Sequence, residues 1–209
     1  NQLSDFTNIR QNGKIAMKLN EKDELVSVIP CGEKDNILLA TRLGKAIRFD
    51  VHDVRVFVGR GSSGVRGIRL KSNDFVVSMS LIPNEEKRFV LSVTENGFGK
   101  RTPVEDYRMT NRGGQGVANI ECSTRNGPVV ASYVASEDDQ IMLVTNSGKL
   151  IRIRVHGGEG DSIRVAGRKT QGVRLFDVDE GEKVVSVALL NESDDDEEAA
   201  SVAAAEVTD

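Results

Sequence analysis

The feature that most constrains this chain is an internal repeat of about fifty residues. Each copy has an apolar segment ending in threonine, then a turn with a Gly-Lys pair, then a second segment that contains arginine. The copies are Ile37–Phe49, Val90–Val104 and Ile141–Ile153. Short apolar segments on either side of a glycine turn predict a β-hairpin. Their recurrence predicts a fold that stacks one small unit several times.

Two further elements follow each hairpin. The first is rich in glycine and contains a Gly-Val pair, and the second is a short apolar stretch. The Gly-Val pairs lie 52 and 56 residues apart, at Gly64-Val65, Gly116-Val117 and Gly172-Val173. The closing apolar stretches are Phe75–Leu81, Val129–Val134 and Val184–Leu190. Half of an earlier unit precedes them, as Asn12–Leu19 and Glu24–Ile29.

We expect an all-β fold of about three and a half four-stranded blades in a propeller-like disc. The apolar residues are mainly Val, Ile and Leu, the chain has 20 Gly and only 4 Pro, and no segment keeps a helical period. One blade cannot bury both of its faces, so neighbouring blades must stack. The predicted organisation is a body at 1–190, comprising a partial blade at 1–30 and blades at 31–82, 83–136 and 137–190, and a disordered acidic tail at 191–209.

Charge is divided unevenly along the chain, so the net charge of −4 hides a basic body. Eight acidic residues and no Lys or Arg lie between Glu192 and Asp209. Residues 1–190 therefore hold 24 of the 32 acidic residues against all 28 basic ones. A basic body joined to an acidic, Ala-rich tail predicts that the body meets a polyanion and that the tail stays unfolded.

The glycine-rich element of each unit also contains or adjoins arginine. Glycine lets a partner approach the backbone closely, and a guanidinium group offers paired donors to phosphate oxygens. A single element of this kind is more simply an ordinary turn with solvated arginines, but its recurrence at one place in every repeat favours phosphate contact. Equivalent loops on stacked blades would meet along one rim. The predicted DNA-contacting residues are Arg42, Lys45, Arg48, Arg60, Arg66, Arg69, Lys71, Lys100, Arg101, Arg108, Arg112, Lys149, Arg152, Arg154, Arg164, Arg168, Lys169 and Arg174.

A rim of this kind would hold and bend duplex DNA. Bending 20–30 bp by 40–90° costs on the order of 1–6 kcal/mol, which many phosphate contacts can offset. Binding through phosphates should be independent of base sequence and should weaken steeply with salt. Aromatic residues make up only 4% of the chain, which argues against a stacking platform for single strands. Charge reversal at Arg66, Arg112 and Arg168 is expected to abolish binding and leave the fold intact.

The sequence shows no catalytic or metal-binding constellation. Cys31 and Cys122 lie far apart and outside any Cys/His cluster, which argues against a disulfide framework and a zinc site. His52 and His156 each follow a turn glycine by eight residues, which common descent of the repeats explains better than a metal site. No apolar stretch is long enough for a membrane span, and no signal peptide pattern begins the chain. We expect a cytoplasmic domain cut from a longer chain, with no cofactor of its own.

These motifs closely resemble the C-terminal domain of the DNA gyrase A subunit, the DNA-wrapping part of a bacterial type II topoisomerase. The matching stretches are GVRGIRL (Gly64–Leu70), ENGFGKRTPVEDY (Glu95–Tyr107), DQIMLVTNSGKLIRIRV (Asp139–Val155) and GRKTQGV (Gly167–Val173). The resemblance extends over essentially all of residues 1–190. It implies a six-bladed β-pinwheel with strand exchange between blades, of which this chain would hold the end of the third blade and the last three.

The resemblance also implies what lies in other domains. The family's catalytic tyrosine belongs to an upstream breakage-reunion domain, so Tyr107 and Tyr133 are not expected to be catalytic. The implied partners are duplex DNA, the gyrase B subunit, and the breakage-reunion domain of the gyrase A subunit, in an A2B2 complex that supercoils DNA negatively. ATP and Mg²⁺ would act elsewhere in that complex. The family's glycine-rich box is absent here; Asn111–Gly116 resembles it most, with Gln115 where the box has lysine.

Three alternatives remain at this point. The A-type subunit of topoisomerase IV has a similar domain with fewer blades, and the complete last blade followed by an acidic tail is more similar to gyrase. A protein-interaction propeller would need WD40 or kelch motifs, which are absent. An enzyme with a propeller fold would need an element such as GxSxG or HExxH, which is also absent. The tail at 191–209 would either aid solubility or compete with DNA for the basic rim.

Overall fold

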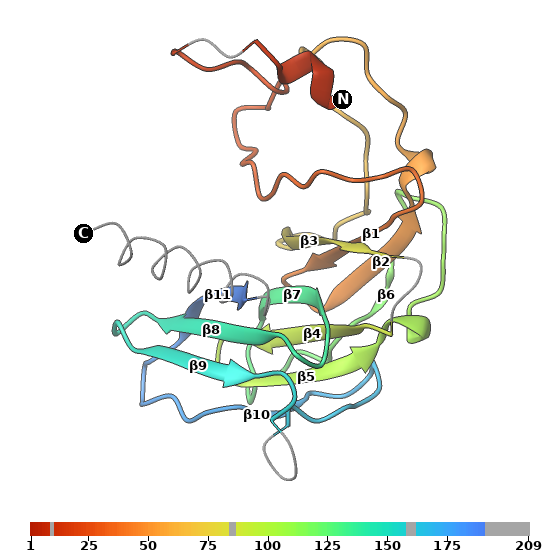
Figure 1. The fold of residues 1–209 in the computed structure, drawn as a ribbon. Helices are drawn as coiled ribbons and strands as arrows, with labels where there is room; N and C mark the ends of the chain where they lie inside the picture. The colour runs from red at the N-terminus through yellow and green to blue at the C-terminus, as the bar shows by residue number, and fades with distance from the viewer. Residues whose placement is uncertain (9–10, 84–86, 158–161, 191–209) are drawn as a thin grey trace, which may run out of the picture.

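The computed structural model describes residues 1–8, 11–83, 87–157 and 162–190, and its regular structure is three β-sheets that pack side by side (Figure 1). One-turn 3-10 helices η1 (Leu3–Phe6), η2 (Val51–Asp53) and η3 (Val104–Asp106) are the helical elements of this part. The all-β prediction is confirmed, and the predicted tail at 191–209 lies outside the described residues. The strands are β1 (Asn36–Thr41), β2 (Lys45–Asp50), β3 (Val76–Ile82), β4 (Phe89–Thr94), β5 (Phe98–Pro103), β6 (Val117–Ala118), β7 (Val129–Ala135), β8 (Gln140–Thr145), β9 (Leu150–Arg154), β10 (Val173–Arg174) and β11 (Val184–Leu190).

Each complete sheet takes its outermost strand from the next unit of the repeat. The first sheet has the order β3-β1-β2-β6, although β6 lies between β5 and β7 in the chain. The second has the order β10-β5-β4-β7, although β10 lies between β9 and β11. All pairings inside these sheets are antiparallel. Each of these two sheets therefore draws on two of the predicted units, which ties neighbouring units together through backbone hydrogen bonds.

The first and last parts of this series of three sheets lack strand partners that the middle part has. The third sheet has the order β11-β8-β9, so no described strand pairs with the outer edge of β9. At the other end, residues 1–35 contain η1 and no described strand, so the strands expected within the partial blade at 1–30 are not formed. β6 and β10 are strands because a preceding sheet accepts them, and the described residues contain no sheet before β1. At β9 the partner that the described residues lack is a strand from a following unit.

The hairpin of each sheet turns on a glycine with positive φ: Gly44 at 78°, Gly97 at 74° and Gly148 at 85°. In the second unit this turn comes before the Gly-Lys pair, so Lys100 is in β5 rather than in the turn. The repeat alignment that placed Lys100 with Lys45 and Lys149 is therefore wrong. Lys100 stands three residues after its turn glycine, as Ile47 does in the first unit. That position faces inward, because Ile47 is only 1% exposed.

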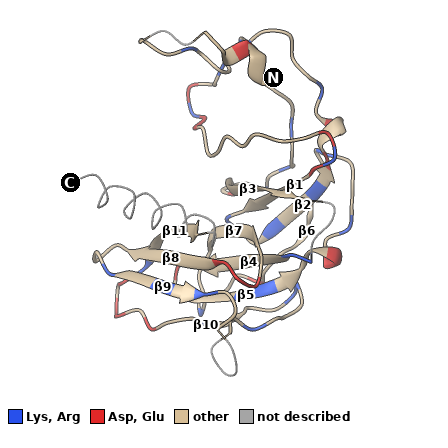
Figure 2. Cartoon of the chain, viewed as in Figure 1, with Lys and Arg blue, Asp and Glu red and all other residues tan. Residues whose placement is uncertain are grey.

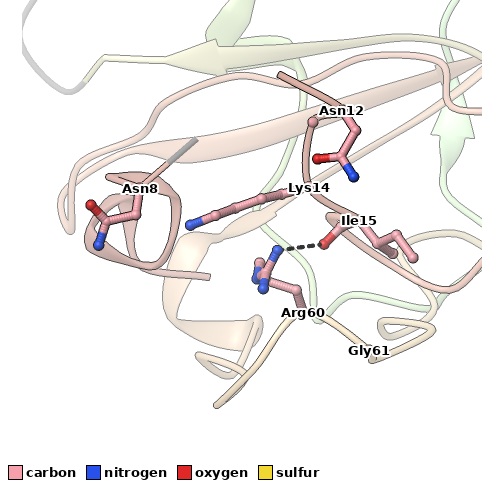
Figure 3. Close-up of a pocket in the computed structure, with 7 residues that line it drawn as sticks. Asn8, Asn12, Lys14, Ile15, Arg60 and Gly61 are labelled. Carbon is pink, nitrogen blue, oxygen red and sulfur yellow. Dashed lines mark hydrogen bonds between the residues drawn. The ribbon is translucent and has the colours of Figure 1, made fainter. Parts of the chain in front are cut away.

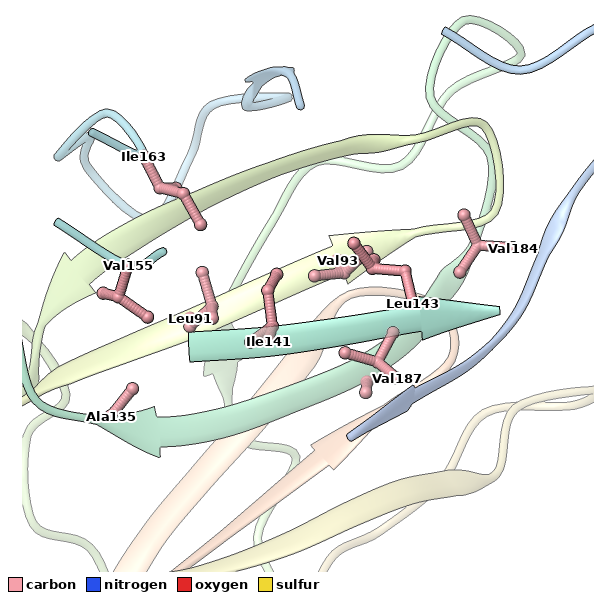
Figure 4. Close-up of a cluster of buried hydrophobic side chains, with 10 residues drawn as sticks. Leu91, Val93, Ala135, Ile141, Leu143, Val155, Ile163, Val184 and Val187 are labelled. Atoms are coloured by element: carbon pink, nitrogen blue, oxygen red, sulfur yellow. The ribbon is translucent and has the colours of Figure 1, made fainter. Parts of the chain in front are cut away.

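Apolar side chains between the sheets form the core. One cluster joins the second and third sheets, where Leu91 and Val93 of β4 meet Ile141 and Leu143 of β8 and Val187 of β11 (Figure 4). Another joins the first and second sheets through residues that include Leu38, Ile82, Val90 and Tyr107. Burying an aliphatic side chain of this size contributes about 1.5–3 kcal/mol relative to leaving it in water. A smaller cluster of Ile37, Ile47, Phe49 and Ile68 lies within the first unit, so the two larger clusters bury apolar surface between units and the smallest one buries it within a unit.

Hydroxyl groups satisfy the inner edges of the sheets where β3 and β7 meet. The backbone N–H of Ser132 in β7 donates to Ser78 Oγ at 3.1 Å, and Ser78 Oγ donates to Ser132 O at 2.8 Å. The N–H of Val134 donates to Ser80 Oγ at 3.3 Å. Buried backbone groups need such partners, because an unsatisfied one costs roughly 1–3 kcal/mol. The inner strands can thus approach each other without forming a continuous sheet.

A buried carboxylate locks the last hairpin. Glu182 accepts hydrogen bonds from the N–H of Asp179 at 2.9 Å, from Thr145 Oγ1 at 2.7 Å, from Lys149 Nζ at 2.9 Å and from Ser147 Oγ. These donors, led by the backbone N–H, stabilise the charged form and lower the pKa of Glu182 to about 2. The turn of the third unit is therefore fixed by a group that must stay ionised.

Replacing Gly44 and Gly148 by alanine in separate variants distinguishes backbone strain from packing in the same turn. Both glycines have positive φ, where another residue costs about 1–2 kcal/mol. A Cβ at Gly44 would lie 2.1 Å from the carbonyl oxygen of Ile120, whereas a Cβ at Gly148 meets nothing within 4 Å. We expect Gly44→Ala to lose roughly 1–3 kcal/mol more unfolding free energy than Gly148→Ala in urea titrations. Equal losses of unfolding free energy in the two variants would show that packing of the next unit against Gly44 does not restrict this turn.

The ionisation of Glu182 predicts a pH-dependent stability. Its folded pKa of about 2 is below the unfolded value of about 4.3, so the carboxylate stabilises the fold above that value, and this contribution is lost as the pH falls toward 2. We expect Glu182→Gln to have a lower Tm than the parent protein at neutral pH, and the difference to shrink between about pH 5 and pH 2. Glu180→Gln removes an exposed carboxylate nearby and serves as the control. A Tm difference that is constant with pH would contradict this role.

Candidate nucleic-acid interface

Every lysine and arginine of the described sheets lies on the outer half of its sheet, that is, on the second hairpin strand (β2, β5 or β9) or on the strand added outside it (β10). The inner strands β3, β7 and β11 and the middle strands β1, β4 and β8 contain none, whereas β2, β5, β9 and β10 do (Figure 2). The inner strands pack against one another, where a charged group would lose its hydration. The sheets therefore carry their basic residues on one side, but the burial and pairing of these residues divide the predicted DNA-contacting set into three groups.

The first group, which we call the rim cations, has side chains that hydrogen-bond to no other described residue. Most of them are exposed, and they lie on the outer strands or on the segments that connect one sheet to the next. Free charges of this kind are what a phosphate-binding surface needs, because their donors are not already used. The rim cations are Lys45, Arg66, Arg69, Lys71, Arg108, Arg154, Arg164 and Lys169.

The second group joins neighbouring units and is directed into the protein. Arg48 of β2 donates to the carbonyl oxygens of Val104 at 3.3 Å and Tyr107 at 3.5 Å, and burial lowers its pKa. Arg101 occupies the equivalent place in β5, is 6% exposed, and donates from Nε to Ile163 O at 2.7 Å. Its guanidinium also lies 4.9 Å from the centre of the Phe89 ring. Both side chains thus bind the connecting segment of the following unit.

Lys100 is the clearest correction to the predicted set. It is 0% exposed, and its Nζ donates to the carbonyl oxygen of Gly167 at 2.5 Å. Burial, with the nearby Arg168 charge adding to it, lowers the pKa of Lys100 to about 8. Lys100 and Arg101 therefore offer no exposed charge to DNA, because β5 turns both side chains toward the next unit.

Arginines of the glycine-rich loops also bind backbone rather than solvent. Arg112 donates to Arg66 O at 2.9 Å and to Asp53 O at 2.8 Å, and Arg168 donates to Ala118 O at 3.0 Å. Arg60 donates to Ile15 O at 3.3 Å, beside a hollow that Lys14 and Asn12 also line (Figure 3). These half-buried guanidinium groups have part of their donor capacity committed within the chain. Charge reversal at Arg112 or Arg168 would therefore disturb the fold, contrary to the expectation from sequence.

The third group is held by acidic or amide side chains. Arg42 pairs with Glu95, which also receives Lys183 Nζ at 3.0 Å, so this carboxylate bridges the hairpins of successive units. Lys149 pairs with Asp179 at 2.6 Å and with Glu182 at 2.9 Å. Arg174 pairs with Asp177, and Arg152 Nε donates to Gln140 Oε1 at 2.7 Å. Pairing with Glu95 or Glu182 cancels much of the charge that Arg42 and Lys149 would bring to a phosphate.

Two exposed arginines were not in the predicted DNA-contacting set, because that set was chosen by recurrence in the repeat. Arg125 is exposed, with its guanidinium 4.9 Å from the centre of the Phe98 ring, but the corresponding turns before β3 and β11 contain no arginine. Arg55 is exposed and stacks 4.5 Å from the centre of the Phe57 ring. Exposed acids interrupt the same side of the sheets, as at Glu105 and Asp106 in η3 after β5 (Figure 2). The surface is therefore a series of basic positions rather than a continuous basic band.

The described residues show no arrangement suited to metal chemistry. No group of three or more His, Cys, Asp or Glu residues among them could hold a metal ion. His52 contacts Asp50 at 2.7 Å, and His156 Nδ1 lies 2.7 Å from Ser162 Oγ. Tyr107 is buried and its hydroxyl donates to Asn119 Oδ1 at 2.6 Å, so its place is in the core. Within the same residues, no helix is long and apolar enough to cross a membrane.

Comparison with known proteins gives a consistent result. The model of the DNA gyrase C-terminal domain, described as a beta-propeller, matches residues 2–32, 35–83, 88–127 and 139–191. The DNA gyrase A subunit of Rickettsia bellii is 41% identical over a 242-residue alignment that covers 94% of this chain and 26% of the relative. The chain thus spans about a quarter of the length of such curated relatives.

Solved structures show the same architecture. A DNA gyrase A C-terminal domain superimposes with a TM-score of 0.75 at 30% identity, covering 90% of this chain and 60% of that one. The C-terminal domain of a DNA topoisomerase IV also gives a TM-score of 0.75, at 28% identity, covering 83% of this chain and 52% of that one. The expected β-pinwheel class is therefore confirmed, and the sheets of the described residues do not close into a complete disc. Because the family model matches most of its residues, this chain belongs to the DNA gyrase C-terminal domain family.

Proposed function

We propose that this chain binds duplex DNA through the rim cations and bends it along the outer strands of its sheets. The observation that carries the proposal is the placement of the rim cations: Lys45 is on β2, Arg154 is on β9, and the others are on the connecting segments that follow β2, β5 and β9, whereas the inner strands β3, β7 and β11 hold no lysine or arginine. Membership of the gyrase family supports the choice of DNA as the polyanion. Several of the rim cations are on connecting segments that recur once per unit, which suits a ligand with regularly repeated phosphates.

The rim cations of successive units occur at equivalent positions. Arg108 and Arg164 each stand four residues before the loop arginine of their own unit, so stacking places them one unit apart. The backbone N–H of Arg101 donates to Arg164 O at 3.1 Å, which places Arg164 against the outer side of β5. A duplex lying across these segments would meet one basic position after another. We propose that the duplex follows this series of positions along a curved path.

Contacts of this kind read the phosphate backbone and not the bases. No aromatic-rich surface accompanies them in the described residues, and phosphate contacts carry no direct sequence information. Neutralising each phosphate releases counterions, so log K falls linearly with log salt by about 0.9 per contact. We therefore propose sequence-independent, salt-sensitive binding in which the protein sets the shape of the DNA.

The wider assembly follows from the family. We propose that the chain acts as the DNA-wrapping part of a gyrase A subunit, working in the cytoplasm with that protein's breakage-reunion domain and with the gyrase B subunit, in an A2B2 complex. ATP hydrolysis and strand passage, with Mg²⁺, would take place in those other parts. The matching family model and the curated relatives are of gyrase, which favours this assignment over topoisomerase IV despite the equal TM-scores. The role proposed for residues 191–209, solubility or competition with DNA, is tested by deleting them and measuring DNA affinity at low salt.

Neutralising Arg108 and Arg164 together tests the proposal. Both are exposed and no described residue pairs with their side chains, so Arg108→Gln with Arg164→Gln should leave the fold unchanged. We expect the slope of log K against log salt to become shallower by about 2, with two unrelated duplex sequences giving the same result. Fluorescence anisotropy of labelled duplexes over a salt series measures the slope.

A matched control removes the same charge elsewhere. Lys22→Gln with Lys34→Gln neutralises two exposed lysines outside the three sheets. We expect this double variant to keep the parent slope. If both double variants lose the same slope, binding follows net charge alone and the rim cations have no special role.

A further inference from the structure

The loop arginines follow one rule at every described junction between units. Arg60, Arg112 and Arg168 each stand four residues before the glycine of their own Gly-Val pair. Each donates to the carbonyl oxygen of the residue two positions after the equivalent glycine of the preceding unit, which is Gly13, Gly64 or Gly116; all three of these glycines have positive φ, although Gly13 is followed by lysine and not by valine. The three bonds are Arg60 to Ile15 O at 3.3 Å, Arg112 to Arg66 O at 2.9 Å, and Arg168 to Ala118 O at 3.0 Å.

The accepting carbonyl lies where a donor is needed. Ala118 is in β6, which pairs with β2 on one side and is the outermost strand of its sheet. Its outer carbonyl therefore has no strand partner, and backbone groups on a partly buried edge need another donor. The guanidinium of Arg168 supplies one, and its position 5.9 Å from the centre of the Tyr107 ring holds it over the second unit.

Arg112 connects more than two segments. Its Nη1 donates to Arg66 O, its Nε donates to Asp53 O at 2.8 Å, and its backbone N–H donates to Asp53 Oδ2 at 3.3 Å. The guanidinium group is planar, so bonds from Nε and Nη1 fix the direction in which the two acceptors lie. A lysine keeps the charge but cannot reproduce that fixed pair of bonds. The bridge therefore depends on geometry and not on charge alone.

We propose that Arg60, Arg112 and Arg168 are positioning residues that set the angle between neighbouring units and hence the curvature of the bound DNA, without contacting phosphate themselves. The part that concerns DNA rests on the proposed function. The backbone bonds hold each loop against the preceding unit, so the rim cations of the two units keep a fixed relation to each other. Arginine then recurs in the glycine-rich loops because each one bonds to the preceding unit, and not because each one contacts phosphate.

The two partners of one hydrogen bond give opposite tests. Arg112→Lys keeps the charge and breaks the bridge, whereas Arg66→Gln keeps the accepting carbonyl and removes a rim cation. We expect Arg112→Lys to leave the slope of log K against log salt unchanged and to alter the bend of bound DNA, measured by energy transfer between dyes at the duplex ends. We expect Arg66→Gln to make the slope shallower by about 0.9 and to leave the bend unchanged. Arg112→Gln should behave as Arg112→Lys does, with the slope kept.

The outcomes separate the two proposals. If Arg112→Gln loses slope while Arg112→Lys behaves as the parent protein, Arg112 contacts phosphate and the positioning role is wrong. If Arg112→Lys lowers the Tm but leaves the bend unchanged, the bridge is merely structural and the proposal also fails. If Arg66→Gln has no effect on the slope, the fault lies with the proposed DNA-binding surface. Small-angle X-ray scattering without DNA compares the overall shape of Arg112→Lys with that of the parent protein, so the bridge can be tested even if the parent protein fails to bend DNA.

Discussion

The outer strand of each complete sheet comes from the next unit along the chain, so neither of these sheets is finished by its own hairpin. A two-residue strand is too short to be stable alone, and β6 and β10 exist because β2 and β5 accept them. The core clusters follow the same plan, since each of the two larger ones lies between two sheets. Stability is therefore a property of junctions, as in other repeat proteins whose units contact only their neighbours.

Sequence periodicity predicted most of the strands because each one has a strong local signal. The apolar runs before and after each turn glycine and the closing apolar stretches all became strands in the three units. The strands that failed were those of residues 1–30, whose pairing depends on a sheet that the described chain does not contain. The register of the second hairpin failed for a local reason: both Gly97 and Gly99 are available, and only the backbone shows that Gly97 makes the turn.

The candidate site was predictable in kind but not residue by residue. A repeated arginine has the same appearance in a sequence whether it reaches outward or binds a carbonyl of the neighbouring unit. Arg66 and Arg112 illustrate this, since one is an exposed cation and the other donates to the first residue's backbone. Lys100 could not be identified as buried, because its alkyl chain occupies a core position and only its Nζ needs the Gly167 carbonyl. Recurrence in the sequence thus identified arginines that hold neighbouring units together. Only the structure shows which basic side chains are unpaired and exposed.

The unpaired outer edge of β9 gives the array a direction. Leu150 is 62% exposed there, whereas its counterpart Ala46 in the first sheet is 0% exposed beneath β6. At each described junction, a strand edge of one sheet accepts a short strand from the following unit, as β2 accepts β6 and β5 accepts β10. The outer edge of β9 is an edge of the same kind on which no described strand lies. An unpaired strand edge presents backbone N–H and C=O groups to which a further strand can add. The pairing that joins β6 to β2 and β10 to β5 would therefore also join a further strand to β9.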